Sequence, residues 1–213
     1  MLLYLARHAR TSSSAVDAYN GRRELPLTEE GRSMARALGA RLAGVRFAAV
    51  YRSPLGRTGE TASLVVPGAQ PEILEGLTEI DYGGWEGLSS SEARARDPRL
   101  FDAWLAQPDL IAPPGGETIA QVAARALAAL DLIAERHERD ALPVLAFSHK
   151  ATLRALGAAL TGAPLAGYRT RWSQDECALN LVELRPGKPA FLRLWNDTAH
   201  LGPDPAATTR GGH

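Results

Sequence analysis

The sequence predicts a single-domain α/β fold with three layers, α/β/α, around a mostly parallel central sheet. Short apolar runs of strand length alternate with amphipathic stretches of helical length along almost the whole chain, a pattern typical of helices that cover both faces of such a sheet. The 213 residues, 45% of them hydrophobic, suffice for one domain with a substantial core. No internal repeat indicates another architecture.

The first elements follow from apolar runs and helix-start signals. Leu2 to Ala6 is an apolar run that stops at a charged residue, as a buried strand does. Thr28 precedes two glutamates, which is typical of a helix N-cap followed by an acidic first turn. The elements expected up to residue 77 are a strand at 2–6, a helix after Thr28, a strand at 48–51, a helix at 57–65 and a weaker strand at 73–77.

The second half contains an interruption and then further alternation. Glycine and proline pairs break residues 81–116, so we expect a lid-like insertion there and no second domain. The later elements expected are a long helix from about Glu117, a strand at 144–147, a helix at 150–160, and strands near 178–184 and 190–195. We expect the domain to span residues 1–201 and residues 202–213 to form a flexible tail.

The composition narrows the possible partners and compartment. Lys+Arg and Asp+Glu both number 24, so nothing favours nucleic acid or an anionic membrane as a partner. Cys177 is the single cysteine, which excludes an intrachain disulfide, and its place at the start of an apolar run predicts burial. No apolar run has the length of a transmembrane helix, and no export signal is evident. We expect a cytoplasmic protein, as a monomer or a homodimer.

Polar residues that carry chemistry follow the expected strands. Arg7 and His8 end the first strand, Arg57 follows the second, Glu79 follows the third candidate, and His149 ends a later one. Ligands of open α/β sheets bind beyond the carboxyl ends of the strands. We therefore expect these four segments to converge on one site.

The convergent set suits phosphoryl chemistry. Two guanidiniums match phosphate oxygens, and a protonated His149 at a helix start adds a further donor. His8 as neutral imidazole is a nucleophile for phosphorus near neutral pH. Glu79, held protonated, can supply a proton to the leaving alkoxide and later accept one from water. The chemistry requires no metal or other cofactor.

At these residues the sequence resembles the histidine phosphatase superfamily, in the phosphoglycerate mutase-like branch that includes alpha-ribazole phosphatase. The resemblance covers almost the whole chain, and the order and spacing of its motifs are together highly specific. The matching segments are residues 5–11 (LARHART), 26–31 (PLTEEG), 53–62 (SPLGRTGETA), 79–87 (EIDYGGWEG), 114–118 (PGGET) and 148–149 (SH). It implies a phosphoglycerate mutase-like fold and a histidine acid phosphatase-type activity on phosphoric monoesters.

The resemblance also implies roles for individual residues. His8 would carry the phosphoryl group, and Glu79 would donate the proton. Arg7, Arg57 and His149 would bind the phosphoryl group, and Asn20 would contact phosphate or substrate.

Several positions depart from the family pattern. Ala9 and Arg10 stand where the family usually has Gly and Glu, Ser14 replaces a usual Asn, and Lys150 replaces a usual Gly. Arg10 and Lys150 add positive charge near the expected site, so we predict a preference for a substrate with a second anionic group. The alternative is that both side chains point to solvent. Ser14 is expected to contact substrate with Asn20, Arg10 and Lys150.

The sequence therefore predicts a metal-independent phosphomonoesterase that hydrolyses a small phosphorylated metabolite through a phosphohistidine. One alternative is a phosphoglycerate mutase-type phosphotransferase, although mutases of this branch typically have a longer segment after the acid motif. A second alternative is a non-catalytic phosphoryl-binding module, supported only by the departures from the pattern. No His-x-His or His-Glu-x-x-His spacing favours a metallohydrolase.

Overall fold

A computed structural model describes residues 1–13, 18–185 and 188–202. Its centre is a six-stranded sheet with the strand order β3-β2-β4-β1-β5-β6. The strands are β1 (Leu2–Arg7), β2 (Ala49–Arg52), β3 (Glu72–Ile73), β4 (Val144–Ser148), β5 (Leu179–Arg185) and β6 (Lys188–Asp197). Strands β1 to β4 are parallel, β5 pairs antiparallel with β1, and β6 pairs antiparallel with β5. The predicted mostly parallel sheet is confirmed.

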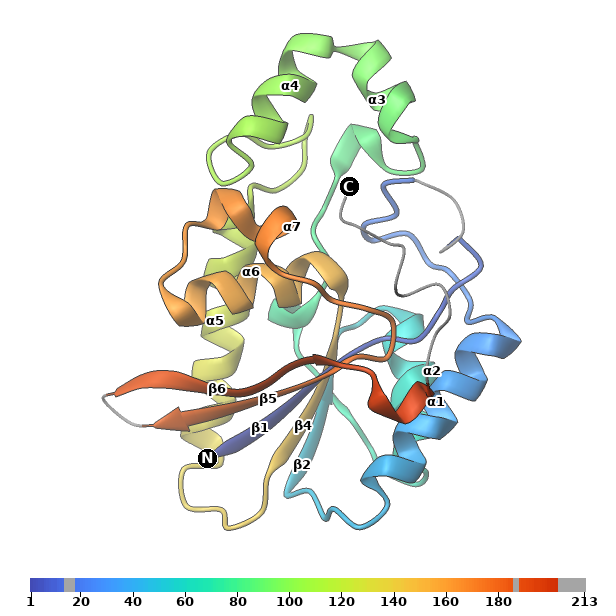
Figure 1. The fold of residues 1–213 in the computed structure, drawn as a ribbon, viewed down its shortest axis with the longest axis vertical. Helices are drawn as coiled ribbons and strands as arrows, with labels where there is room; N and C mark the ends of the chain where they lie inside the picture. The colour runs from blue at the N-terminus through green and yellow to red at the C-terminus, as the bar shows by residue number, and fades with distance from the viewer. Residues whose placement is uncertain (14–17, 186–187, 203–213) are drawn as a thin grey trace.

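Helices cover both faces of this sheet, which gives the three predicted layers (Figure 1). They are α1 (Glu29–Leu42), α2 (Gly56–Val65), α3 (Ser90–Arg96), α4 (Pro98–Ala106), α5 (Ile119–Arg136), α6 (Lys150–Thr161) and α7 (Tyr168–Arg171). Short 3-10 turns lie at Glu75–Leu77, Gly83–Trp85, Leu165–Gly167 and Ala199–Leu201. One core cluster joins the sheet to α5 and α6, and a second joins it to α1 and α2.

Strand β1 lies between β4 and β5, and its side chains alternate between the two clusters. Leu3 and Leu5 pack in the cluster with α5 and α6, and Ala6 packs in the cluster with α1 and α2. Both faces are buried, which is why the run is continuously apolar. The register pairs Arg7 with Ser148, so β1 and β4 end side by side.

Helix α1 begins where the sequence predicts it. The Thr28 side chain accepts a hydrogen bond from Gly31 N at 2.9 Å, and thus caps the helix. A Cβ at Gly31 would lie 2.2 Å from Arg10 O, so only glycine permits the loop after β1 to approach the helix so closely.

The segment predicted as an insertion stands apart from the sheet, at the top of Figure 1. Helices α3 and α4 pack on a small cluster of their own, formed by Trp85, Ala93, Phe101 and Trp104. In the part of the chain that the structure describes, no helix has the length and apolar character to cross a membrane.

Two elements differ from the prediction. The weaker strand at 73–77 is wrong in extent, since only Glu72–Ile73 pairs with β2 and Glu75–Leu77 forms a 3-10 turn. Helix α5 passes too closely for a strand there, because a Cβ at Gly76 would lie 2.5 Å from Arg125 O. Helix α7 was not predicted. Ser14 and most of the expected tail, residues 203–213, lie outside the described residues.

Candidate active site

Two histidines lie together at the carboxyl ends of the central strands. His8 follows β1, and its main-chain N–H donates to Ser148 O at 3.0 Å. His149 follows β4, and the centroids of the two imidazoles are 5.1 Å apart. The predicted convergence of these two segments results from the shared register of β1 and β4.

The buried His8 ring is held by a hydrogen bond at Nδ1. Its Nδ1 lies 2.7 Å from Ala9 O, and because a carbonyl only accepts, Nδ1 carries the proton. Burial lowers the pKa of His8 well below its ordinary value, and the charges of Arg7 and Arg57 lower it further. His8 is therefore neutral near pH 7, with its lone pair at Nε2.

His149 is held by two neighbours in one tautomer. Arg57 Nε–H donates to Nδ1 at 3.2 Å, so the proton is on Nε2, which donates to Ser53 Oγ at 2.6 Å. Ser53 Oγ in turn lies 3.0 Å from Thr58 Oγ1. Burial lowers the pKa of His149 well below its ordinary value, with Arg57 the next cause. The protein alone thus holds His149 neutral, in contrast to the cationic form expected from sequence.

The two arginines surround the histidines. Arg57 is almost fully buried, and its Nη1 and Nη2 donate to Arg23 O and Gly21 O, both at 2.7 Å. Arg7 Nη1 donates to Gln174 O at 2.7 Å, while its buried Nε finds no partner in the described part of the chain. Burial lowers the pKa of both guanidiniums, and the Glu79 carboxylate opposes that shift in each. Glu79 therefore lies within electrostatic reach of both cations.

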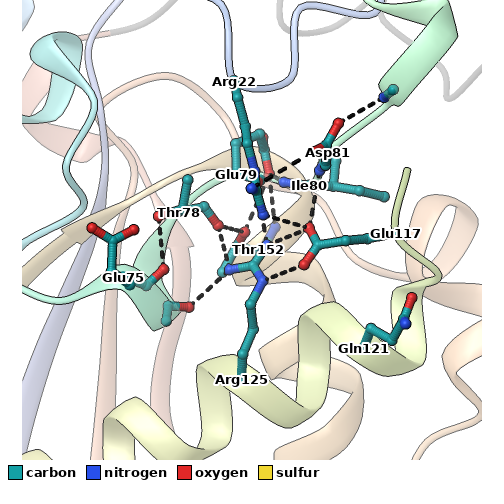
Figure 2. Close-up of polar contacts among 12 residues, drawn as sticks. Arg22, Glu75, Thr78, Glu79, Ile80, Asp81, Glu117, Gln121, Arg125 and Thr152 are labelled. Atoms are coloured by element: carbon teal, nitrogen blue, oxygen red, sulfur yellow. Dashed lines mark hydrogen bonds and ion pairs between the residues drawn. The ribbon is translucent and has the colours of Figure 1, made fainter. Parts of the chain in front are cut away.

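The Glu79 carboxylate sits at the start of α6. Its Oε1 accepts from Ile80 N at 3.0 Å and from Thr152 N at 3.1 Å, and its Oε2 accepts from Ala151 N at 3.1 Å. Thr152 Oγ1 also lies 3.2 Å from Oε1 (Figure 2). A helix N-terminus stabilises a negative charge, which explains this placement. Oε2 has fewer donors than Oε1, so it is the oxygen more open to a proton.

Arg125 of α5 fixes the main chain that carries Glu79 (Figure 2). Its guanidinium donates to Gly76 O at 2.9 Å, Thr78 O at 2.6 Å and Glu79 O at 3.1 Å. It also pairs with both oxygens of Glu117, at 2.9 and 3.0 Å. The half-buried guanidinium of Arg125 thus holds the segment around Glu79 against the long helix.

Glu117 extends this network to the loop after β1. It accepts from Asp81 N at 3.0 Å and pairs with Arg22 Nη2 at 3.2 Å. Arg22 is the neighbour of Gly21 and Arg23, whose carbonyls bind Arg57. The guanidinium of Arg57 and the Glu79 segment are therefore linked through two loops.

The other predicted contact residues lie in different surroundings. Arg10 pairs with Glu176 at 2.6 Å and with Glu30, so two carboxylates engage its guanidinium. Asn20 Nδ2 donates to Ala18 O at 3.2 Å, and its buried Oδ1 has no partner among the described residues. Lys150 is exposed at the start of α6. Loss of solvation and the charges of Arg7 and Arg154 lower its pKa to about 8.

Three further features concern metal binding, the thiol of Cys177 and a separate cavity. Within residues 1–13, 18–185 and 188–202, no group of three His, Cys, Asp or Glu side chains is placed to hold a metal ion. Cys177 is buried, as predicted, and burial raises its pKa to about 12. A cavity of about 720 Å³ lined by residues such as Asp131, Glu135 and Lys188 includes none of the residues described above.

Sequence reasoning did not assign roles to Ser53, Arg125 or Thr152. Only Arg125 could have been suspected from the sequence. It directly precedes Ala126, a residue of the apolar stripe of α5, and an arginine beside such a stripe needs hydrogen-bond acceptors if it is buried. Ser53 and Thr152 follow strand ends, but nothing local distinguishes them from ordinary turn and helix residues.

An α/β fold with two histidines, two arginines and a glutamate at one edge of its sheet defines a phosphoryl-transfer class of enzyme. The sequence matches the Histidine phosphatase superfamily (branch 1) over residues 3–198, and the chain belongs to this family. It is a phosphomonoesterase of the phosphoglycerate mutase-like branch.

Similar proteins agree with this assignment. The chain is 33% identical over 204 residues to a metal-independent phosphoserine phosphatase of Arabidopsis thaliana, covering 93% of this chain and 82% of the relative. It is 37% identical over 212 residues to a 2,3-bisphosphoglycerate-dependent phosphoglycerate mutase of a Methylobacterium strain, covering 92% and 93%. The structure of the alpha-ribazole phosphatase from Shigella flexneri matches with a TM-score of 0.83 at 27% identity, covering 93% of this chain and 97% of that one.

Proposed function

We propose that this enzyme hydrolyses a small phosphorylated metabolite through a phosphohistidine at His8, without a metal ion. The orientation of His8 is the observation that carries the proposal. Its Nδ1–H is bonded to the main chain at 2.7 Å, so the neutral ring directs Nε2 away from that bond as the nucleophile. Arg7 and Arg57, close enough to lower the pKa of His8, supply the charge that attracts a phosphoryl group.

In the first step, His8 Nε2 forms a bond to phosphorus as the bond to the ester oxygen breaks. The departing alkoxide takes a proton from Glu79, whose Oε2 is the oxygen with fewer donors. A substrate that enters as its monoanion can bring this proton to the carboxylate, since the second pKa of a phosphomonoester is about 6.

In the second step, water attacks the phosphohistidine and Glu79 accepts its proton. Inorganic phosphate leaves, and His8 returns to the neutral form. Arg57 has the further role of holding His149 beside His8, since its Nε–H donates to His149 Nδ1 at 3.2 Å.

Turnover of p-nitrophenyl phosphate in excess EDTA tests the proposal. We expect activity that survives the chelator and is lost in His8→Ala, with a folded circular dichroism spectrum retained. Activity restored only by added metal would contradict the metal-independent part. Failure to turn over any phosphomonoester would favour a phosphoryl-binding module.

A mutase is the second candidate, supported by the likeness to the Methylobacterium enzyme. This chain covers 93% of that mutase, so chain length does not separate the two activities. Isomerisation of 3-phosphoglycerate that depends on a bisphosphate primer and exceeds phosphate release would decide for the mutase.

A further inference from the structure

A second group of cations lies next to the phosphoryl site and has no part in the chemistry above. Lys150 and Arg154 are one turn apart on α6, so they share a face of the helix. Arg169 lies on α7, which packs against α6, and its guanidinium carbon is 4.7 Å from the centroid of the Trp104 ring. These residues connect the phosphoryl site with the α3–α4 segment.

The charge of Arg7, in the proposed site, also acts on this group. The positive charge of Arg7 lowers the pKa of both Lys150 and Arg154, and Arg169 lowers that of Arg154, although burial is the larger cause in each case. Glu79 and Asp175 are the carboxylates that oppose this effect at Lys150. Like charges held this close in a partly desolvated place repel one another, and an anion would relieve the repulsion.

The same region holds polar atoms that lack partners. Arg154 Nε, Arg169 Nη1, Trp104 Nε1 and Tyr19 Oη are buried and make no hydrogen bond with any described residue. The Tyr19 and Trp104 rings meet edge to face, with their centroids 5.6 Å apart. Guanidinium and indole nitrogens only donate, so a single kind of ligand satisfies them: one rich in acceptors. Buried donors without acceptors are rare in proteins because each costs free energy.

We propose that Arg154 and Arg169, with Trp104 beside them, bind a carboxylate on the non-phosphate end of the substrate. The inference rests on the proposed phosphatase function and narrows it to phosphomonoesters of hydroxy acids or amino acids. Two carboxylate oxygens offer enough lone pairs for the three unpartnered nitrogens. Arg10, expected from sequence to serve a second anion, is instead engaged by Glu30 and Glu176.

Matched substrates test this assignment. Phosphoserine and phosphoethanolamine differ only in the carboxylate, which phosphoethanolamine lacks. In the second pair, 3-phosphoglycerate has a carboxylate where glycerol 3-phosphate has a hydroxymethyl group. We expect kcat/KM for the carboxylate-bearing ester to exceed that of its partner in both pairs. Arg154→Gln and Arg169→Gln should each reduce that ratio about 10- to 100-fold, the effect of one hydrogen bond to a charged group. Arg171→Gln is the matched control, since Arg171 is exposed on the same helix as Arg169.

A binding measurement separates this inference from the proposed function. Calorimetry on the His8→Ala protein should show tighter binding of phosphoserine than of phosphoethanolamine, and Arg154→Gln in that background should remove the difference. If carboxylate-dependent binding is present while wild-type turnover of every ester is absent, the subsite stands and the hydrolytic function fails. Equal turnover and equal binding within each pair, in wild type and variants alike, would overturn the subsite.

Discussion

Ser53 Oγ lies 2.6 Å from His149 Nε2, and it accepts the hydrogen bond of a histidine whose other nitrogen accepts from Arg57. The hydroxyl is itself held at 3.0 Å from Thr58 Oγ1, so a short chain of hydrogen bonds leads from α2 to the His149 ring. Ser53 thus positions His149, which we propose as a phosphoryl-binding residue, without being expected to contact the substrate.

The first prediction concerns this contact. Ser53→Ala leaves the buried Nε2–H of His149 without its acceptor, so kcat should fall by about tenfold with a smaller change in KM. The pH dependence of kcat should shift as well, because the Nε2–H of His149 then lacks the acceptor that Ser53 supplies. Ser63→Ala is the control, since Ser63 is exposed on α2 and its hydroxyl donates to Glu60 O of the same helix. A pH profile and kcat identical to wild type would show that the contact is only structural.

The second prediction concerns pH and stability. Burial lowers the pKa of His8 and His149 in the folded protein, so the unfolded chain binds more protons below the ordinary histidine pKa of about 6.5. The contribution of these histidines to the free energy of unfolding should therefore be at its full value above that pH. It should decline as the pH falls below it, by up to about 1.4 kcal/mol per histidine and pH unit.

Urea denaturation at a series of pH values measures this effect. The variant that carries both His8→Asn and His149→Asn should show a flatter dependence between pH 7 and pH 5 than wild type. An unchanged slope in the double variant would assign the pH dependence to other groups.

The third prediction concerns Arg125. Arg125→Gln removes donors from three carbonyls and leaves Glu117 without its main partner, so the free energy of unfolding should fall by about 2–3 kcal/mol. Because the Glu79 main chain is among the groups released, kcat should fall too. Arg136→Gln, on the same helix with an exposed pair to Glu72, should cost about 0.5 kcal/mol or less. Equal effects of the two variants would count against the clamp.

The fourth prediction concerns Cys177. Burial raises the pKa of this thiol to about 12, and only thiolate reacts with iodoacetamide. We expect no labelling of the folded protein at pH 8 and full labelling in urea, measured by mass spectrometry. Rapid labelling of the folded protein, with activity lost in parallel, would instead point to a role for the thiol.

The fold was predictable because its signals are local. The apolar run before Arg7 and the Thr28 cap each act over a few residues, and the structure has both where the sequence predicts them. The short β3 was not predictable, since its extent depends on the approach of α5 to Gly76, which is distant in sequence.

The candidate site was predictable in part for the same reason. His8 and His149 follow strong strands, so topology alone places them together. Arg125 donates to main-chain carbonyls that are distant in sequence. Arg154 and Arg169 place buried donors on two separate helices. No local sequence pattern marks either arrangement. Arg10 shows the opposite case: the sequence places its charge near the site, while Glu30 and Glu176 engage it.

Direct detection of the phosphorylated residue tests the central claim best. After rapid mixing with phosphoserine or p-nitrophenyl phosphate and an alkaline quench, peptide mass spectrometry should find an acid-labile phosphoryl group on His8, and none in His8→Ala. Burst-phase release of p-nitrophenol in step with this signal is the expected kinetic counterpart. Steady turnover with no phosphoryl group on His8 at any time, or with full activity in His8→Ala, would contradict the account.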